Sequence, residues 1–280
     1  MTFFGASVTT VGWPSGISIA EMYKKDAAAY DGKGLGPYCE FFAGSKGDWV
    51  DCLQRYQKVG WGKNPNEKVP VLCAKVHTNS SLDEVITYFG ERKTPWCAVF
   101  MHEIQGFIMN GDITVAKYRK THEQMATRRK HHLRYGKYMQ IVGINAGYWI
   151  FKHANQSKKR GIDVLTLFKG MPIDVVSVDH YFRRTPVQGP GYLKTYLAGF
   201  DQLAADAKRL GVPWAVTEMG LDTRLGSGRP KFLQDVVVRL RKKGALWALY
   251  WEGGGQADYR LRGHPDALAV WKAAIASGKA

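Results

Sequence analysis

Two glutamates stand where they could act together. Glu103 lies in the segment AVFMHEIQG and Glu218 in AVTEMG, each directly after a short apolar run. Two facing carboxylates are the minimal machinery for glycosidic hydrolysis, because one protonates the leaving oxygen while the other attacks the anomeric carbon or activates water. At a separation of about 5–5.5 Å the second carboxylate is a nucleophile, and configuration is retained. The alternative is that the two glutamates form unrelated salt bridges in loops.

The elements that must position these residues follow a simple alternation along the chain. Short apolar runs predict strands at Phe3–Val8, Tyr38–Phe42, Val69–Val76, Trp96–His102, Met139–Ala146, Asp174–Asp179, Pro213–Glu218 and Ala245–Trp251. Amphipathic stretches between and after them predict helices at Ile19–Tyr30, Gly47–Val59, Leu82–Arg92, Ile113–Tyr135, Tyr192–Leu210, Pro230–Lys243 and Pro265–Ala276, with a shorter patch at Asp163–Lys169. We predict one α/β domain over residues 1–280, a (β/α)8 TIM barrel. A doubly wound sheet competes, but the turn after the first strand, GASVTTVGWPSG, lacks the GxGxxG pattern.

The predicted strand ends carry side chains that packing alone does not require. In this fold the C-terminal strand ends form the mouth that holds the active site. The polar and aromatic residues there are Glu40, His77, His102, Glu103, Asn145, Asp179, His180, Tyr181, Glu218, Trp251 and Glu252. Strands four and seven lie nearly opposite each other, so their two glutamates should face each other across the mouth. Trp13, Tyr148 and Trp149 are candidates for outer sugar subsites, with core packing as the alternative for each ring.

Four short motifs carry a family resemblance. AVFMHEIQG and AVTEMG resemble the paired signatures of the clan A glycoside hydrolases. The histidine before the first glutamate resembles family 26, best known for β-mannanases. KGMPIDVVSVDHY is similar to that family's strand-six motif, and GYWIF fits the same comparison. The chain differs from the family in IQGFIMNGD, which has no tryptophan, and in WEGGGQADYR after strand eight.

The resemblance implies roles for five residues. Glu103 matches the acid/base and Glu218 the nucleophile, while Tyr181 matches the tyrosine that hydrogen-bonds and orients the nucleophile. His102 matches the residue that borders the acid/base and touches the sugar. Trp251 matches the aromatic floor under the sugar that is cleaved. These roles agree with the chemistry, because an indole stacks on the apolar face of a pyranose and a phenol donor tunes a carboxylate.

The charge of the chain is its least ordinary property. There are 40 Lys+Arg against 24 Asp+Glu, a formal net charge of +16. Such a charge favours polyanionic partners, and it leads us to expect an anionic or cell-surface glycan as substrate. The alternative is a cationic surface that only keeps the protein in solution. The basic stretch Ile113–Tyr135 has few interleaved aromatics, so no nucleic acid is expected, and no apolar run predicts membrane insertion.

Metal and cofactor chemistry is not indicated. The HExxH pattern that begins at His102 fails, because Gly106 occupies the place of the second histidine. His77, His180 and Asp179 could ligate a metal as in a barrel amidohydrolase, but strand one lacks HxH. The four cysteines form no CxxC pair and are expected to be free thiols. We expect neither a metal nor an organic cofactor.

The sequence therefore predicts a retaining glycoside hydrolase that cuts within a polysaccharide, β-mannan-like, β-glucan-like or anionic. The alternative is a non-catalytic carbohydrate-binding barrel that attaches to an anionic cell envelope. A lyase or aldolase would need a strand-end lysine, and the strand-end residues named above include none. The start MTFFGASV reads as a strand rather than a signal peptide. We expect a monomer made in the cytoplasm, either phage-encoded or released to reach an extracellular glycan.

Overall fold

The described strands form one parallel sheet. The computed structural model describes residues 2–7, 29, 73–75, 79–93, 95–182, 191–253 and 257–277. Its strands are β1 (Phe3–Ser7), β2 (Cys73–Lys75), β3 (Trp96–Val99), β4 (Met139–Ala146), β5 (Val175–Phe182), β6 (Trp214–Leu221) and β7 (Trp247–Trp251). They pair in parallel in the order β1-β7-β6-β5-β4-β3-β2. The predicted strand Tyr38–Phe42 and helix Gly47–Val59 lie outside the described residues, so closure by an eighth strand stays a prediction.

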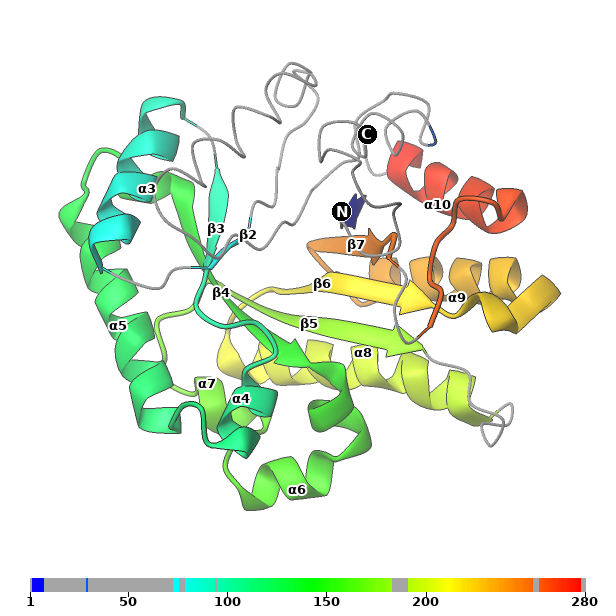
Figure 1. Ribbon diagram of the computed structural model, residues 1–280, viewed down its shortest axis with the longest axis horizontal. Helices are drawn as coiled ribbons and strands as arrows, with labels where there is room; N and C mark the ends of the chain where they lie inside the picture. The colour runs from blue at the N-terminus through cyan, green and yellow to red at the C-terminus, as the bar shows by residue number, and fades with distance from the viewer. Residues whose placement is uncertain are drawn as a thin grey trace.

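Helices cover the outside of this curled sheet (Figure 1). The α-helices are α3 (Asn79–Glu91), α4 (Ile104–Asn110), α5 (Val115–His131), α6 (Ala154–Lys159), α7 (Val164–Phe168), α8 (Gly191–Leu210), α9 (Arg229–Lys242) and α10 (Pro265–Ser277). Short 3₁₀ helices span Gly136–Tyr138 and Thr223–Gly228, and a π-helix spans Tyr148–Lys152. Of the predicted helix Ile19–Tyr30, only Ala29 is described, and it is helical. In the part of the chain that the structure describes, no helix combines the length and apolarity needed to cross a membrane.

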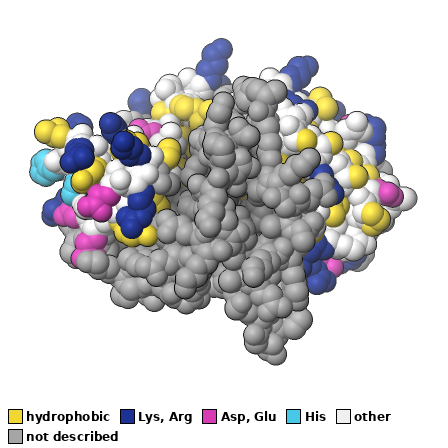
Figure 2. Space-filling model, turned by 90° about the horizontal axis from the view of Figure 1, so that it is seen from above, with side chains coloured by type: hydrophobic (Ala, Val, Ile, Leu, Met, Phe, Trp, Pro, Cys, Tyr) yellow, Lys and Arg dark blue, Asp and Glu magenta, His cyan; other side chains and the backbone are white. Residues whose placement is uncertain are grey.

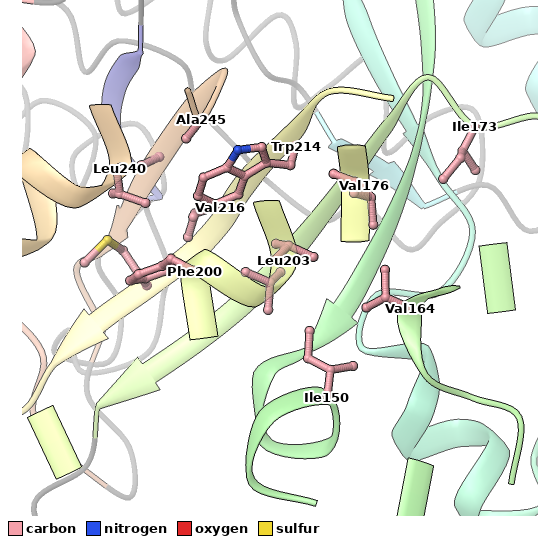
Figure 3. Packing of buried hydrophobic residues seen from close by; sticks show 14 of the residues in the cluster. Ile150, Val164, Ile173, Val176, Phe200, Leu203, Trp214, Val216, Leu240 and Ala245 are labelled. Carbon is pink, nitrogen blue, oxygen red and sulfur yellow. The ribbon is translucent and has the colours of Figure 1, made fainter. Parts of the chain in front are cut away.

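Two hydrophobic clusters mark the two faces of the sheet. The inner cluster draws its fully buried members from strands alone: Cys97, Val99, Val142, Ile144, Val175, Ala215, Trp247 and Leu249. The outer cluster joins strands to helices, and Figure 3 shows Phe200 and Leu203 of α8 against Trp214 and Val216 of β6. Both faces are therefore buried, which is why these strands are nearly continuous apolar runs.

Alternation along β5 assigns its polar residues to opposite faces. Val175 belongs to the inner cluster and Val176 to the outer cluster. Successive strand residues point to opposite faces, so Asp179 and Tyr181 lie on the inner face and His180 on the outer face. Of the three polar residues near the C-terminal end of β5, two therefore point to the inner face of the sheet.

A β-bulge in β6 sets the direction of Glu218. Val216 belongs to the outer cluster, so strict alternation would also send Glu218 outward. The pairing with β5 shifts here, because Glu218 lies opposite Asp179 and Thr217 is an extra residue on β6. An extra residue reverses the phase of alternation beyond it. Glu218 consequently turns to the inner face, where it contacts Tyr181.

Several arginines of the basic helix α5 form ion pairs or hydrogen bonds with neighbouring elements. Arg128 forms an ion pair with Asp83 of α3 at 2.7 Å, and Arg129 pairs with Asp174 just before β5. Arg119 donates to the Leu167 carbonyl at the end of α7 at 2.8 Å. These contacts dock α5 on its neighbours. On the face seen in Figure 2, further Lys and Arg side chains lie on both sides of the molecule.

Two buried histidines make stability depend on pH. His122 lies on the buried face of α5 with its ring 4.4 Å from that of Tyr118, and His180 stacks on Tyr196 of α8 at 4.1 Å. Burial lowers the pKa of each imidazole to about 4, from 6.5. The unfolded chain therefore binds more protons between those pH values, so stability is complete above about pH 6.5 and falls as the pH drops toward 4. At pH 5 we expect each histidine to lower the free energy of unfolding by about 2 kcal/mol.

Urea unfolding at pH 7 and pH 5 measures this effect. His180→Phe should lose about half of the acid destabilisation that wild type shows, although it also removes a hydrogen bond to the Tyr196 carbonyl. His131→Phe, on the exposed end of α5, is the control and should keep the wild-type pH dependence. An unchanged dependence in His180→Phe would show that this imidazole is not held neutral by burial.

Candidate active site

A tyrosine–glutamate pair lies on the inner face of the sheet, near the C-terminal ends of β5 and β6. The Tyr181 hydroxyl on β5 donates a hydrogen bond to Oε2 of Glu218 on the neighbouring strand β6. Burial raises the pKa of Tyr181 well above its usual value, and the negative charges of Glu218 and Asp179 raise it further. Tyr181 therefore stays a neutral phenol, a hydrogen-bond donor at any pH near neutrality.

Glu103 belongs to the same electrostatic group. Its carboxylate also raises the pKa of Tyr181, which places a third negative charge near the phenol. The three carboxylates come from separate elements: Glu103 precedes α4, Asp179 lies on β5 and Glu218 on β6. The two glutamates that the sequence singled out are thus brought to one tyrosine, although they lie far apart along the chain.

Aromatic rings line one side of this group. The Trp251 ring at the end of β7 meets Tyr181 edge-on, with centroids 5.0 Å apart. Tyr259 stacks on Trp251 at 5.9 Å and lies 5.2 Å from Tyr181. A Cβ on Gly220 would come within 2.7 Å of the Tyr259 ring, so a glycine is needed opposite it. Sequence reasoning missed Tyr259, because it follows a loop rather than ending a strand.

Three residues predicted at the mouth lie on the outer face instead, and this corrects their assignment. His180 is buried among Phe151, Tyr196 and Phe200, under α8. Asn145 and Glu252 are fully buried, with no exposed surface for a sugar. The physical reason is the same for all three. Each directly neighbours an inward-pointing strand residue, and alternation turns it the other way.

Glu252 helps to hold the segment that carries Tyr259. Its Oε2 accepts from the Leu261 backbone N–H at 3.0 Å. Buried Arg229 of α9 holds the same segment from the other side, donating to the Tyr259 and Arg260 carbonyls and, at 2.8 Å, to the Tyr250 hydroxyl. Two buried charges therefore fix the segment that completes the aromatic wall.

Removing the Arg229 charge should destabilise the fold strongly. Arg229→Met removes the hydrogen bonds to the Tyr259 and Arg260 carbonyls and to the Tyr250 hydroxyl, and a buried group left without a partner costs about 1–3 kcal/mol. We expect a loss of roughly 3 kcal/mol in the free energy of unfolding, measured with urea. Arg239→Met is the matched control. Arg239 pairs with Asp201 at the surface at 2.9 Å, and its loss should cost less than about 1 kcal/mol. Equal losses in both variants would show that Arg229 does not hold the segment that carries Tyr259.

The remaining predicted site residues fall into two groups. His102 is half-buried immediately before Glu103, and Trp149 lies in the π-helix after β4. The Trp149 ring packs edge-on against Tyr148, which is 53% exposed, so this pair forms an open aromatic surface after the strand. Trp13, Glu40 and His77 lie outside the described residues. Among the side chains that are described, no three His, Cys, Asp or Glu groups gather as a metal site would require.

Comparison with known proteins finds likeness in structure only. No family model matches the chain, and no curated protein matches it at a significant level. The catalytic domain of a GH26 endo-β-1,4-mannanase from Bacillus sp. JAMB-750 is 10% identical, with a TM-score of 0.61 over 99% of this chain and 86% of that one. A GH26 β-mannanase from Bacteroides ovatus is 13% identical, with a TM-score of 0.56 over 99% and 89%.

A third solved structure is also similar to this chain. Cel5A of Thermotoga maritima, solved in complex with cellobiose, is 12% identical, with a TM-score of 0.59 over 96% of each chain. At these identities the likeness establishes the fold alone. The described strands curl into a parallel sheet with helices on its outer side, and this arrangement matches part of the TIM-barrel fold of these enzymes.

Proposed function

We propose that this protein is a retaining glycoside hydrolase in which Glu218 is the nucleophile and Glu103 the general acid/base. The observation that carries the proposal is the Tyr181–Glu218 hydrogen bond, with the charge of Glu103 acting on the same phenol. A carboxylate oriented by a neutral donor, near a second carboxylate in a barrel mouth, is the arrangement that double displacement requires.

The reaction follows from these positions in two steps. In the first, Glu218 attacks the anomeric carbon while Glu103 gives its proton to the leaving oxygen, so the glycosidic bond breaks as the ester to Glu218 forms. In the second, Glu103 takes a proton from water, whose oxygen attacks the anomeric carbon and releases Glu218. Two inversions leave the configuration unchanged, and Glu103 ends as it began.

Tyr181 prepares the nucleophile for the first step. Its hydroxyl donates a hydrogen bond to Oε2 of Glu218 and so orients the attacking carboxylate. The bond restricts rotation of the carboxylate, so less ordering is needed when the sugar arrives. As the ester forms, Glu218 loses its charge, and the high pKa of Tyr181 ensures that the phenol remains protonated throughout.

The proposed substrate is a polysaccharide that is cut internally. The half-buried Trp251 ring, backed by the buried ring of Tyr259, offers a flat face suited to the apolar face of a pyranose. Trp149 and Tyr148 offer a second aromatic surface after β4 for a more distant sugar. The net charge of +16 favours an anionic or cell-surface glycan over neutral β-mannan or β-glucan. We further propose that the protein reaches this glycan after release from the cytoplasm.

Reducing-end release from a panel of neutral and acidic polysaccharides and bacterial envelope glycans tests the proposal. We expect release from at least one β-linked glycan, with products of retained anomeric configuration by NMR. Added salt should reduce the rate on an acidic glycan and leave a neutral one unaffected. Binding to a glycan without release would instead support a non-catalytic barrel that attaches to an envelope.

A further inference from the structure

The backbone around Glu103 is held in an unusual conformation. Glu103 has φ 52° and ψ 41°, and Met101, two residues earlier, has φ 57°. Both lie in the left-handed region, which residues with a Cβ rarely adopt. Such a conformation persists only where the surrounding structure holds it. The Glu103 side chain makes no capping hydrogen bond to α4, so the carboxylate is not used to start the helix.

A buried amide network lies directly behind this strained turn. Gln105, two residues after Glu103, is fully buried. Its Nε2 donates to Oδ1 of Asn145 at 2.5 Å and to the Ile162 carbonyl at 3.4 Å. Its Oε1 accepts from the Ala146 backbone N–H at 2.9 Å. One side chain thereby ties the first turn of α4 to the end of β4 and to the loop before α7.

Asn145 extends the network to the next strand. Its Nδ2 donates to the Ser177 carbonyl of β5 at 2.9 Å, two residues before Asp179. With the contacts to Gln105, both polar atoms of the Asn145 side chain are engaged, and no part of it reaches solvent. A fully satisfied buried network has a single favourable arrangement, because any shift leaves a polar group unpaired. The turn that carries Glu103 is therefore fixed relative to β4 and β5.

We propose that Gln105, supported by Asn145, is the positioning residue for the acid/base glutamate Glu103, setting where its carboxyl group meets the leaving oxygen. The inference rests on the proposed function and deepens it. Gln105 touches neither substrate nor reacting atoms, since it is buried on the outer side of β4. It acts by holding the left-handed turn, so its loss moves the proton donor without removing it.

The leaving group distinguishes positioning from plain structural support. Gln105→Met keeps the volume of the side chain and removes its hydrogen bonds. Departure of a glycan oxygen needs a proton from Glu103, whereas a 2,4-dinitrophenolate leaves without one. We expect kcat/KM on the glycan to fall about 10- to 100-fold, as for a reacting group displaced by about 1 Å. On the dinitrophenyl glycoside of the same sugar it should fall less than about threefold.

Two controls accompany the variant. Gln140→Met makes the same change at the opposite end of β4, where Gln140 accepts from the Cys97 thiol at 3.9 Å, and both rates should stay near wild type. Leu203→Ala, in the outer cluster, destabilises the fold without touching the turn, and the ratio of the two rates should not change. Equal losses on both substrates in Gln105→Met, or no loss on either, would overturn the positioning role. If wild type cleaves neither substrate, the proposed function fails instead.

Discussion

Glu218→Gln is expected to lower kcat/KM by about 10⁴-fold or more on every substrate, activated or not. The amide keeps the shape of the side chain and still accepts the hydrogen bond from Tyr181, but it cannot attack the anomeric carbon. Because no leaving group is good enough to replace the missing nucleophile, glycans and dinitrophenyl glycosides should be affected alike. Initial rates on both substrates measure the effect.

Rescue and a matched control make this expectation specific. In Glu218→Ala, added azide should restore turnover by attacking from the vacated side, and the glycosyl azide should have inverted configuration by NMR. Glu123→Gln makes the same chemical change on exposed α5 and should leave the rates unaltered. Substantial cleavage by Glu218→Gln, or an azide product of retained configuration, would mean that another carboxylate is the nucleophile. Asp179, opposite Glu218 on β5, would then be the first to examine.

Glu103→Gln is expected to show a leaving-group dependence that Glu218→Gln lacks. Without the proton donor, kcat/KM on a glycan should fall about 10²- to 10⁴-fold, the usual contribution of general acid catalysis. A dinitrophenyl glycoside needs no proton to depart, so its kcat/KM should change little. Its kcat should fall, because the second step still requires Glu103 to take a proton from water.

The pH profile provides a second readout. The alkaline limb of wild-type kcat/KM on the glycan reports loss of the Glu103 proton, and it should vanish in Glu103→Gln. The same Glu123→Gln variant serves as control and should keep that limb. Equal loss on both substrates, with an unchanged pH profile, would show that Glu103 is not the acid/base.

Strand positions are predictable from the sequence to a large extent. The predicted strand Met139–Ala146 coincides with β4, and the predicted helices Leu82–Arg92 and Pro230–Lys243 overlap α3 and α9 almost completely. Strands buried on both faces are apolar throughout, and amphipathic helices alternate with them, so each element is visible in its own residues. Strand ends are less predictable, because β5 and β6 each continue three residues beyond their predicted ends.

The errors within the site share one cause. The prediction places Asp179, His180 and Tyr181 at the mouth as a group, although consecutive strand residues cannot all point the same way. His180 points to α8. The same alternation of side chains turns Glu252 away from the face that Trp251 occupies. Both orientations follow from counting positions along each strand from an inward-pointing residue, so local periodicity is enough to correct them.

The sequence by itself determined the alternating elements, because these depend on residue type and local period, and it singled out the two glutamates, with Tyr181 added by the resemblance of the motifs. Only the tertiary structure decided which way Glu218 faces. The bulge at Thr217 reverses the alternation, and it arises from pairing with β5 rather than from β6 alone. Tertiary contacts likewise decided the placement of Glu103, since its left-handed turn is held by Gln105 and Asn145 from across the fold. Alternation is a local property, whereas a change of register and a held turn depend on neighbours that are distant in the chain.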